Sequence, residues 1–233
     1  MKIALLGFGK MGRLVEQAAL QRGHEVVYKL RSQKDEGQNL HDADLCIDFS
    51  HEQVLLQHVE LAASSGKNLV IGTTGWDSQL PQVLGLAEKY QIGLLYSPNF
   101  SLGMHIFMKI ATEAAKWMNG CEDYDIAIQE MHHRTKTDSP SGTALALADL
   151  LLEKIKRKNS QTLSIASSRF GNVPGTHTLI FDSEIDSITL THSARKRDGF
   201  ASGAIKAAEW LQGRRGVYTF EDAFEDILAG PFS

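Results

Sequence analysis

The stretch Ile3-Ala4-Leu5-Leu6-Gly7-Phe8-Gly9-Lys10-Met11-Gly12 decides the fold predicted for this chain. Its apolar beginning is typical of a buried strand, and residues 13–21 after it have the pattern of an amphipathic helix. The glycines between follow the spacing G-x-G-x-x-G, in which Gly7 makes a tight turn, Gly9 lets the backbone approach a pyrophosphate and Gly12 allows close helix packing. The stretch therefore predicts a dinucleotide-binding turn; the alternative is the same turn without a ligand.

Further strand-helix units follow this opening. Apolar segments that predict strands lie at 25–30, 45–49, 68–71 and 92–96, and Ser50 is suited to cap a helix at 52–64. Strands that alternate with helices of this length form a parallel, right-handed, doubly wound sheet of the Rossmann type. Ligands bind such a sheet at the carboxyl ends of its strands. The residues that we expect to contact the cofactor there are Gly7, Phe8, Gly9, Lys10, Met11, Gly12, Arg31, Ser32, Gly72, Thr73, Thr74, Ser97, Pro98, Asn99 and Phe100.

The end of the second predicted strand bears on the choice of cofactor. An acidic residue there would accept hydrogen bonds from the adenosine ribose and repel a 2′-phosphate. The chain instead has Lys29, Arg31 and Ser32, and no acid until Asp35. This favours NADPH over NADH, although a basic strand end can also be a solvated terminus.

A predicted helix from about Ala144 to Lys156 follows a predicted strand at 125–129. Asp138 or Ser139 is suited to cap this helix, and Pro140 to its first turn. Unpaired backbone N–H groups at a helix start attract anions, and we expect a carboxylate to bind here. The N–H groups in question belong to Ser141, Gly142 and Thr143.

Histidines and cations crowd the loop before that helix. His132 and His133 titrate near neutrality, so one of them can exchange a proton, while Arg134 and Lys136 can hold negative charge. This composition suits an acidic small molecule that undergoes proton transfer. The alternative is a solvated loop.

The middle of the chain predicts a second domain. A helix to about Met118 is followed by segments at 162–167, 176–181 and 187–191 that alternate polar and apolar residues, which indicates antiparallel strands. Helices at 201–211 and 220–228 should pack back on the first domain. The predicted fold is therefore α/β, with a doubly wound sheet in a dinucleotide-binding domain (1–101 and 198–233) and an inserted α+β substrate-binding and oligomerisation domain (102–197) whose sheet is antiparallel or mixed.

Composition excludes several classes of protein. A formal charge of −4 on 233 residues gives no general reason to bind nucleic acid, and no apolar run is long enough to span a membrane. No signal peptide precedes the first strand, and Cys46 and Cys121 lack metal-ligand spacing. We expect a cytoplasmic protein with no metal site.

The segment 130–144 matches the signature E-x-H-H-x-x-K-x-D-x-P-S-G-T-A. Through it the chain resembles the 4-hydroxy-tetrahydrodipicolinate reductase (dihydrodipicolinate reductase) family of bacterial lysine and diaminopimelate synthesis. Supporting matches are the glycine stretch, Ile-Asp-Phe-Ser at 47–50, Ile-Gly-Thr-Thr-Gly at 71–75, and Asn99-Phe100-Ser101 followed by Gly103.

The resemblance implies hydride transfer from NADPH, with NADH as an alternative donor, to a cyclic dicarboxylate, followed by protonation. By carry-over, His132 is the acid/base group and Lys136 the proton donor, whereas His133, Gly142 and Thr143 bind a substrate carboxylate. Two rival functions remain at this point: a dinucleotide sensor without catalysis, and an enzyme with another substrate, such as an amino-acid dehydrogenase.

The resemblance also implies a homotetramer built through the sheets of the second domain. The side chains of His177, Leu179 and Phe181 alternate along one predicted strand and form a face that is apolar enough to be buried in an interface. The segment after Arg169 is shorter here than in longer members of the family, which removes part of that surface.

Overall fold

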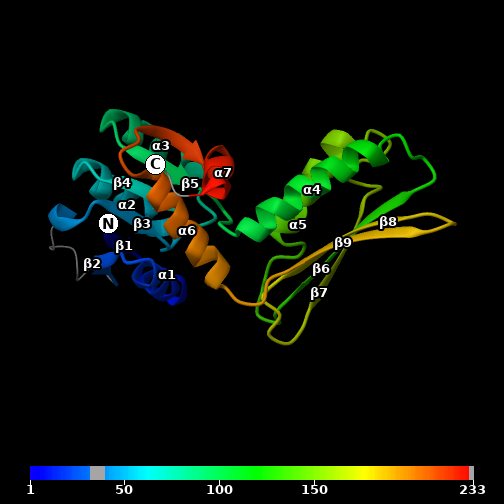
Figure 1. Cartoon of the computed structure of the whole chain (residues 1–233), viewed down its shortest axis with the longest axis horizontal. Coiled ribbons are helices and arrows are strands. Elements are labelled where there is room, and N and C mark those ends of the chain that lie inside the picture. Colours follow the sequence, from blue (N-terminus) through cyan, green and yellow to red (C-terminus); the bar gives the residue numbers. More distant parts are fainter. Residues whose placement is uncertain (32–39, 231–233) are drawn as a thin grey trace. The chain divides into compact units, whose positions relative to one another are not determined.

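The computed structural model describes residues 1–31 and 40–230. The chain divides into two compact units, one of Met1–Leu102 with Arg197–Ser233 and the other of Gly103–Lys196 (Figure 1). The second unit is thus inserted, in the chain, between the two segments of the first. No helix in the described ranges is long and apolar enough to cross a membrane.

The first unit contains a parallel sheet, in the order β10-β5-β4-β3-β1-β2 among the described residues. Strand β10, the last strand of this sheet along the chain, was not expected from the sequence, because it is short and half polar. The strands are β1 (Lys2–Leu6), β2 (Glu25–Leu30), β3 (Leu45–Asp48), β4 (Asn68–Ile71), β5 (Gly93–Tyr96) and β10 (Gly216–Thr219).

Helices cover both faces of this sheet. Ile3 and Leu5 of β1 point into one core with α1, α6 and α7, while Ala4 and Leu6 point into another with α2 and α3. Successive side chains of a strand point to opposite faces, so an apolar run is the pattern of a strand that is buried on both sides. The doubly wound fold is therefore confirmed. The helices are α1 (Lys10–Gln21), α2 (Glu52–Ser64), α3 (Leu80–Lys89), α6 (Asp198–Leu211) and α7 (Phe220–Ala229).

The second unit has a mixed sheet in the order β7-β6-β8-β9, packed on two helices. Strands β6 and β7 are parallel, whereas β8 runs antiparallel to β6 and β9. The sheet is thus mixed, one of the two arrangements expected from the sequence. Strands β6 and β7 are parallel because a helix lies between them in the chain and returns it to the end of the sheet where β6 begins. The elements are α4 (Leu102–Met118), β6 (Asp125–His132), α5 (Gly142–Lys154), β7 (Ser164–Arg169), β8 (Thr176–Asp182) and β9 (Ser187–Ser193).

Two predicted helix caps are wrong. The N-cap of α2 is His51, because the Ser50 hydroxyl donates instead to Asp48. Helix α5 is capped by Ser141, whose Oγ accepts from the N–H of Ala144 at 3.2 Å. Pro140 therefore precedes the cap and does not lie in the first turn.

Candidate active site

The glycine-rich turn between β1 and α1 is as tight as its spacing predicts. Gly7 has φ +91°, and a Cβ on it would lie 2.6 Å from the carbonyl oxygen of Phe49. A Cβ on Gly12 would lie 2.3 Å from the carbonyl oxygen of Gly7, so the helix starts directly against the turn. Gly9, the N-cap of α1, has open space beside it, and the first turn of the helix carries no acid. This is a helix start that suits a phosphate group.

A buried carboxylate organises the neighbouring loops. Asp48, at the end of β3, accepts hydrogen bonds from the hydroxyls of Ser50 at 2.8 Å and Thr73 at 2.5 Å, and pairs with Nδ1 of His58 at 2.7 Å. The hydroxyl of Thr73 also accepts from the N–H of Ser50 at 2.7 Å. Because its side chain is occupied in this way, Thr73 supports the loop, while Gly72 and Thr74 flank it at the sheet edge.

The loop after β5 is held partly by hydrogen bonds among its own residues. The Ser97 hydroxyl donates to the carbonyl of Asn99 at 2.7 Å, and the Asn99 side chain accepts from the N–H of Ser101 at 2.8 Å. Phe100 is 1% exposed, and its ring packs in the core against Phe220. Pro98 is exposed beside it.

Three cations surround the ring of Phe8 in the glycine-rich turn. The guanidinium carbon of Arg31 lies 5.1 Å from the ring centroid, as does Nζ of Lys29, and Arg13 lies 5.7 Å away. Lys29 is also paired with Glu16. Arg31 is exposed at the end of β2, while Ser32 lies outside the described residues. The basic strand end is thus assembled around an aromatic ring next to the turn.

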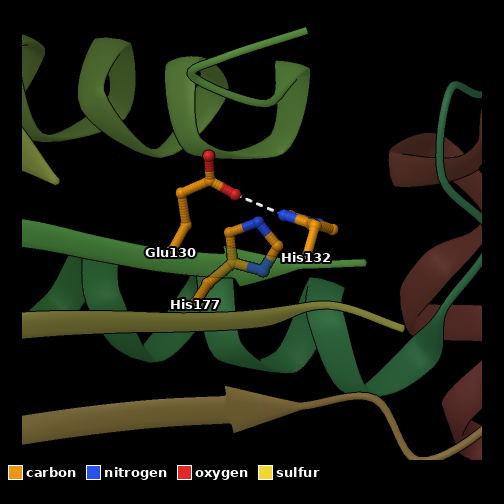
Figure 2. Close-up of side chains that lie close together, drawn as sticks. All are labelled: Glu130, His132 and His177. Carbon is orange, nitrogen blue, oxygen red and sulfur yellow. Dashed lines mark hydrogen bonds and ion pairs between the residues drawn. The ribbon is translucent and has the colours of Figure 1, made fainter. Parts of the chain in front are cut away.

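In the second unit, the alternation of β6 places Glu130 and His132 on its buried face. Glu130 is 1% exposed and His132 is 7% exposed. The Glu130 carboxylate pairs with Nδ1 of His132 through Oε2, while its Oε1 accepts from Arg169 at 2.6 Å and from the N–H of Ser141 at 3.2 Å. His177 of β8 completes the group, with its ring centroid 5.1 Å from that of His132. Figure 2 shows the carboxylate and the two imidazoles converging.

The charges of this group follow from its contacts. Burial by itself would raise the pKa of Glu130, but Arg169, Ser167 and His132 outweigh it and lower the pKa to about 2. Burial lowers the pKa of His132 and lowers that of His177 to about 4; Glu130 opposes both shifts. Near neutral pH the carboxylate is therefore ionised and both imidazoles are neutral.

Glu130, His132 and His177 could also be considered as metal ligands, because their ligand atoms lie within 4.8 Å of one another. The carboxylate already accepts from a guanidinium, an imidazole and a backbone N–H. A cation would have to displace these donors beside the positive charge of Arg169. We therefore describe the group as a hydrogen-bonded network and assign no metal to it.

The loop after β6 carries the remaining predicted residues. Lys136 is half-buried and pairs with Asp138 at 2.7 Å, and Nδ1 of His133 lies 2.8 Å from the hydroxyl of Thr135. One expectation for the start of α5 was wrong: the N–H of Ser141 is not available to an external anion, because Glu130 accepts it. Gly142 is exposed and Thr143 half-buried at the same helix start.

Three residues of this site were missed in the sequence. Glu130 lies in the matched signature. It is also two residues after Ile128 and so on the same face of β6 as the apolar side chains, which was a usable signal for a buried carboxylate. His177 was noted only as part of an apolar face. Arg169 gave no signal, since its contact with Glu130 depends on the parallel pairing of β6 with β7, in which it lies opposite His132.

The glycine-rich turn, the doubly wound sheet and the buried histidine network define an oxidoreductase that uses a pyridine nucleotide. The family model described as dihydrodipicolinate reductase, N-terminus, matches residues 1–100, and the model for the C-terminus of the same family matches residues 103–224. The chain belongs to the dihydrodipicolinate reductase family.

Relatives over the whole length agree. A 4-hydroxy-tetrahydrodipicolinate reductase of Christiangramia forsetii is 38% identical over 98% of this chain and 99% of its own. One of Archaeoglobus fulgidus is 36% identical over 97% of this chain and 100% of its own. These relatives are named as catalysts of reduction, which supports an enzyme and not a dinucleotide sensor.

A solved structure shares the complete fold. Dipicolinate-bound dihydrodipicolinate reductase from Paenisporosarcina sp. TG-14 is similar with a TM-score of 0.76 and 26% identity, over 95% of this chain and 98% of that one. GenD2 from gentamicin A biosynthesis, in complex with NAD, matches at a TM-score of 0.61 with 10% identity, which shows the fold alone.

Proposed function

We propose that this protein reduces 4-hydroxy-tetrahydrodipicolinate to tetrahydrodipicolinate with a reduced nicotinamide cofactor, in lysine and diaminopimelate synthesis. The reaction consumes one hydride and one proton and releases the hydroxyl group as water. The observation that carries the proposal is the loop after β6, where a buried, oriented His132 is followed by Lys136. Relatives with this activity in their names align along nearly the whole chain.

The proposed roles in the second unit are divided between proton exchange and charge binding. His132 is the acid/base group, and Lys136 supplies the proton that follows the hydride. His133 and the exposed start of α5 at Gly142 and Thr143 bind a carboxylate of the dicarboxylate substrate. That dipicolinate, a cyclic diacid, is bound to the similar Paenisporosarcina enzyme supports this substrate class.

The cofactor is proposed to lie along the carboxyl edge of the parallel sheet. Its pyrophosphate contacts the turn 7–12, and its nicotinamide half contacts residues 72–74 and 97–100. NADPH is the preferred form, because Arg31 stands where an acid would select NADH. NADH remains a usable donor in this proposal.

Two further parts of the proposal concern assembly and location. A homotetramer is proposed because the sheet of the second unit has one face that its own helices do not cover. A cytoplasmic location is supported by the free thiols of Cys46 and Cys121, since reducing compartments keep cysteines unpaired.

The test follows nicotinamide absorbance with freshly generated hydroxy-tetrahydrodipicolinate. Lys136→Ala is expected to lower turnover by about 10²- to 10⁴-fold, the usual loss for a general acid, with cofactor affinity unchanged because Lys136 lies outside the nucleotide-binding unit. Lys154→Ala, a half-buried lysine at the end of α5 that pairs with Glu153, is the control. Full turnover by a folded Lys136→Ala protein would contradict the role, and oxidation of cofactor only with an amino acid would favour the rival dehydrogenase.

A further inference from the structure

The Glu130 carboxylate has its two oxygens committed to different donors. Oε1 accepts from the guanidinium of Arg169 at 2.6 Å and from the N–H of Ser141 at 3.2 Å, and Oε2 is left for Nδ1 of His132. Arg169 also donates to the carbonyl of Asp138 at 2.7 Å. The carboxylate is therefore held from three elements, β7, α5 and β6, so its position does not depend on the imidazole.

These contacts dictate where the proton of His132 resides. An ionised carboxylate is an acceptor only, so Nδ1 must carry a hydrogen to bond with it. Burial lowers the pKa of His132, so the ring is neutral and has a single N–H. Nε2 then has the lone pair. In water, by contrast, a neutral imidazole can place its proton on either nitrogen.

Gly175 decides whether Nε2 can be reached. It lies just before β8, and a Cβ built on it would be 3.0 Å from Nε2 of His132 and 3.3 Å from the neighbouring ring carbon. Contacts this close are tighter than ordinary van der Waals packing. Any side chain at this position would therefore cover the nitrogen that Glu130 leaves with a lone pair.

We infer that Glu130 and Gly175 are positioning residues that make Nε2 the working nitrogen of His132, Glu130 by fixing the proton on Nδ1 and Gly175 by leaving Nε2 uncovered. The inference rests on the proposed function, because it specifies the atom through which His132 exchanges protons with a substrate. It adds two positioning residues, one on β6 and one just before β8, that act through His132 and are not proposed to contact the substrate.

The primary test reads the tautomer directly. Nitrogen-15 chemical shifts of the imidazole, assigned by comparison with His132→Gln, are expected to show Nδ1 protonated and Nε2 unprotonated at neutral pH. Glu130→Gln should shift the proton toward Nε2, because an amide can donate to Nδ1 where a carboxylate can only accept. A protonated Nε2 in the unchanged protein, or the same tautomer in Glu130→Gln, would overturn the inference. This measurement needs no turnover, so it stands apart from a failure of the proposed reaction.

Kinetics supply the second readout. Glu130→Gln is expected to lower kcat on the order of 10²-fold with the KM for the dinucleotide unchanged. Gly175→Ala should lower kcat/KM for the substrate while the tautomer of His132 stays as in the unchanged protein, a separation that general unfolding would not produce. It also carries the test if Glu130→Gln does not fold. Because Gly175 has φ +157°, alanine is also strained there. Gly213→Ala, at φ +74° with nothing within 4 Å of the new Cβ, is therefore the matched control. An unchanged kcat/KM in Gly175→Ala would overturn the inference that Gly175 keeps Nε2 of His132 accessible.

Discussion

At the scale of single residues, the position of Arg31 yields a prediction about cofactor choice. Its guanidinium lies over the ring of Phe8 beside the glycine-rich turn. Arg31 directly follows β2, where an acid would select NADH, so it is our candidate to bind a 2′-phosphate. A charge-assisted contact of about 1.5–3 kcal/mol corresponds to a preference for NADPH of roughly ten- to a hundred-fold.

Arg31→Glu should erase or reverse that preference, because the new carboxylate would repel the phosphate and accept from a ribose hydroxyl. Calorimetric titration with both cofactors measures it, and Arg134→Glu, in the other unit, is the control. Equal affinity for NADPH and NADH in the unchanged protein would mean that the basic strand end is only solvated.

His177 makes a second prediction, about stability and pH. Burial lowers its pKa to about 4, with His132, His192 and Lys136 adding to the shift and Glu130 opposing it. The unfolded chain binds the proton with a pKa of about 6.5, so between these values it holds more protons than the folded protein. The stability due to a neutral His177 is complete above pH about 6.5 and is lost as the pH falls toward 4, at up to about 1.4 kcal/mol per pH unit. Loss of the Glu130 charge continues the decline below pH 4.5, toward about 2.

Unfolding in urea at a series of pH values checks this. His177→Gln should reduce the slope between pH 6.5 and 4, leaving the part that buried His132 and His192 contribute. His41→Gln, whose side chain is 85% exposed, should leave the slope as it is. Identical slopes in both variants would refute the assignment.

At the scale of elements, the sequence was most informative where one periodicity ran through a whole segment. Strands β2 and β4 and helix α2 have the predicted bounds, because their apolar runs and helical spacing each indicate a single type of secondary structure. Helix starts were less predictable. Ser50 and Ser141 are both good cap residues, and only the partners of their hydroxyls, Asp48 for one and Ala144 for the other, decide which of them caps a helix.

The same limit applies to the site. The glycine turn and the loop with His132 and Lys136 could be located because each is contiguous in the chain. The partners of Glu130 could not, since Arg169 is 39 residues away and meets it only once β6 and β7 pair in parallel. Contacts fixed by strand pairing leave no local pattern in a single sequence.

The start of α5 makes a prediction at this scale. Ser141 caps the helix through Ala144, and its Oγ lies 3.2 Å from Nε2 of His177. Ser141→Ala removes both contacts and should lower the free energy of unfolding by about 1–2 kcal/mol. Ser160→Ala, exposed in the loop between α5 and β7, should change it by less than about 0.5 kcal/mol. Urea denaturation of the two variants measures the difference; equal values would mean that the helix start does not depend on this cap.

At the scale of the whole molecule, the question is what covers the sheet of the second unit. The apolar set that suggested an interface, His177, Leu179 and Phe181, is buried inside the unit against α4 and α5, so that part of the argument for assembly no longer holds. The opposite face is different. Within the described residues it is lined by the half-buried Met131 and Ile180 and by exposed, mostly polar residues, among them Gln129, Ala166, Ser168, Thr189 and Thr191.

A sheet face that the helices of its own unit leave uncovered can pack on a second sheet, so we predict a homotetramer that buries this surface. Light scattering at micromolar concentration should give four times the 25.7 kDa of one chain. Ala166→Lys places a long cation on this face, in the middle of its edge strand β7, and should lower the mass, because the charge would have to be buried without a partner. Ala146→Lys, the same change on the exposed side of α5, should leave the mass unaltered. A mass of 25.7 kDa for the unchanged protein would show that the face is stable in water and that the tetramer is wrong.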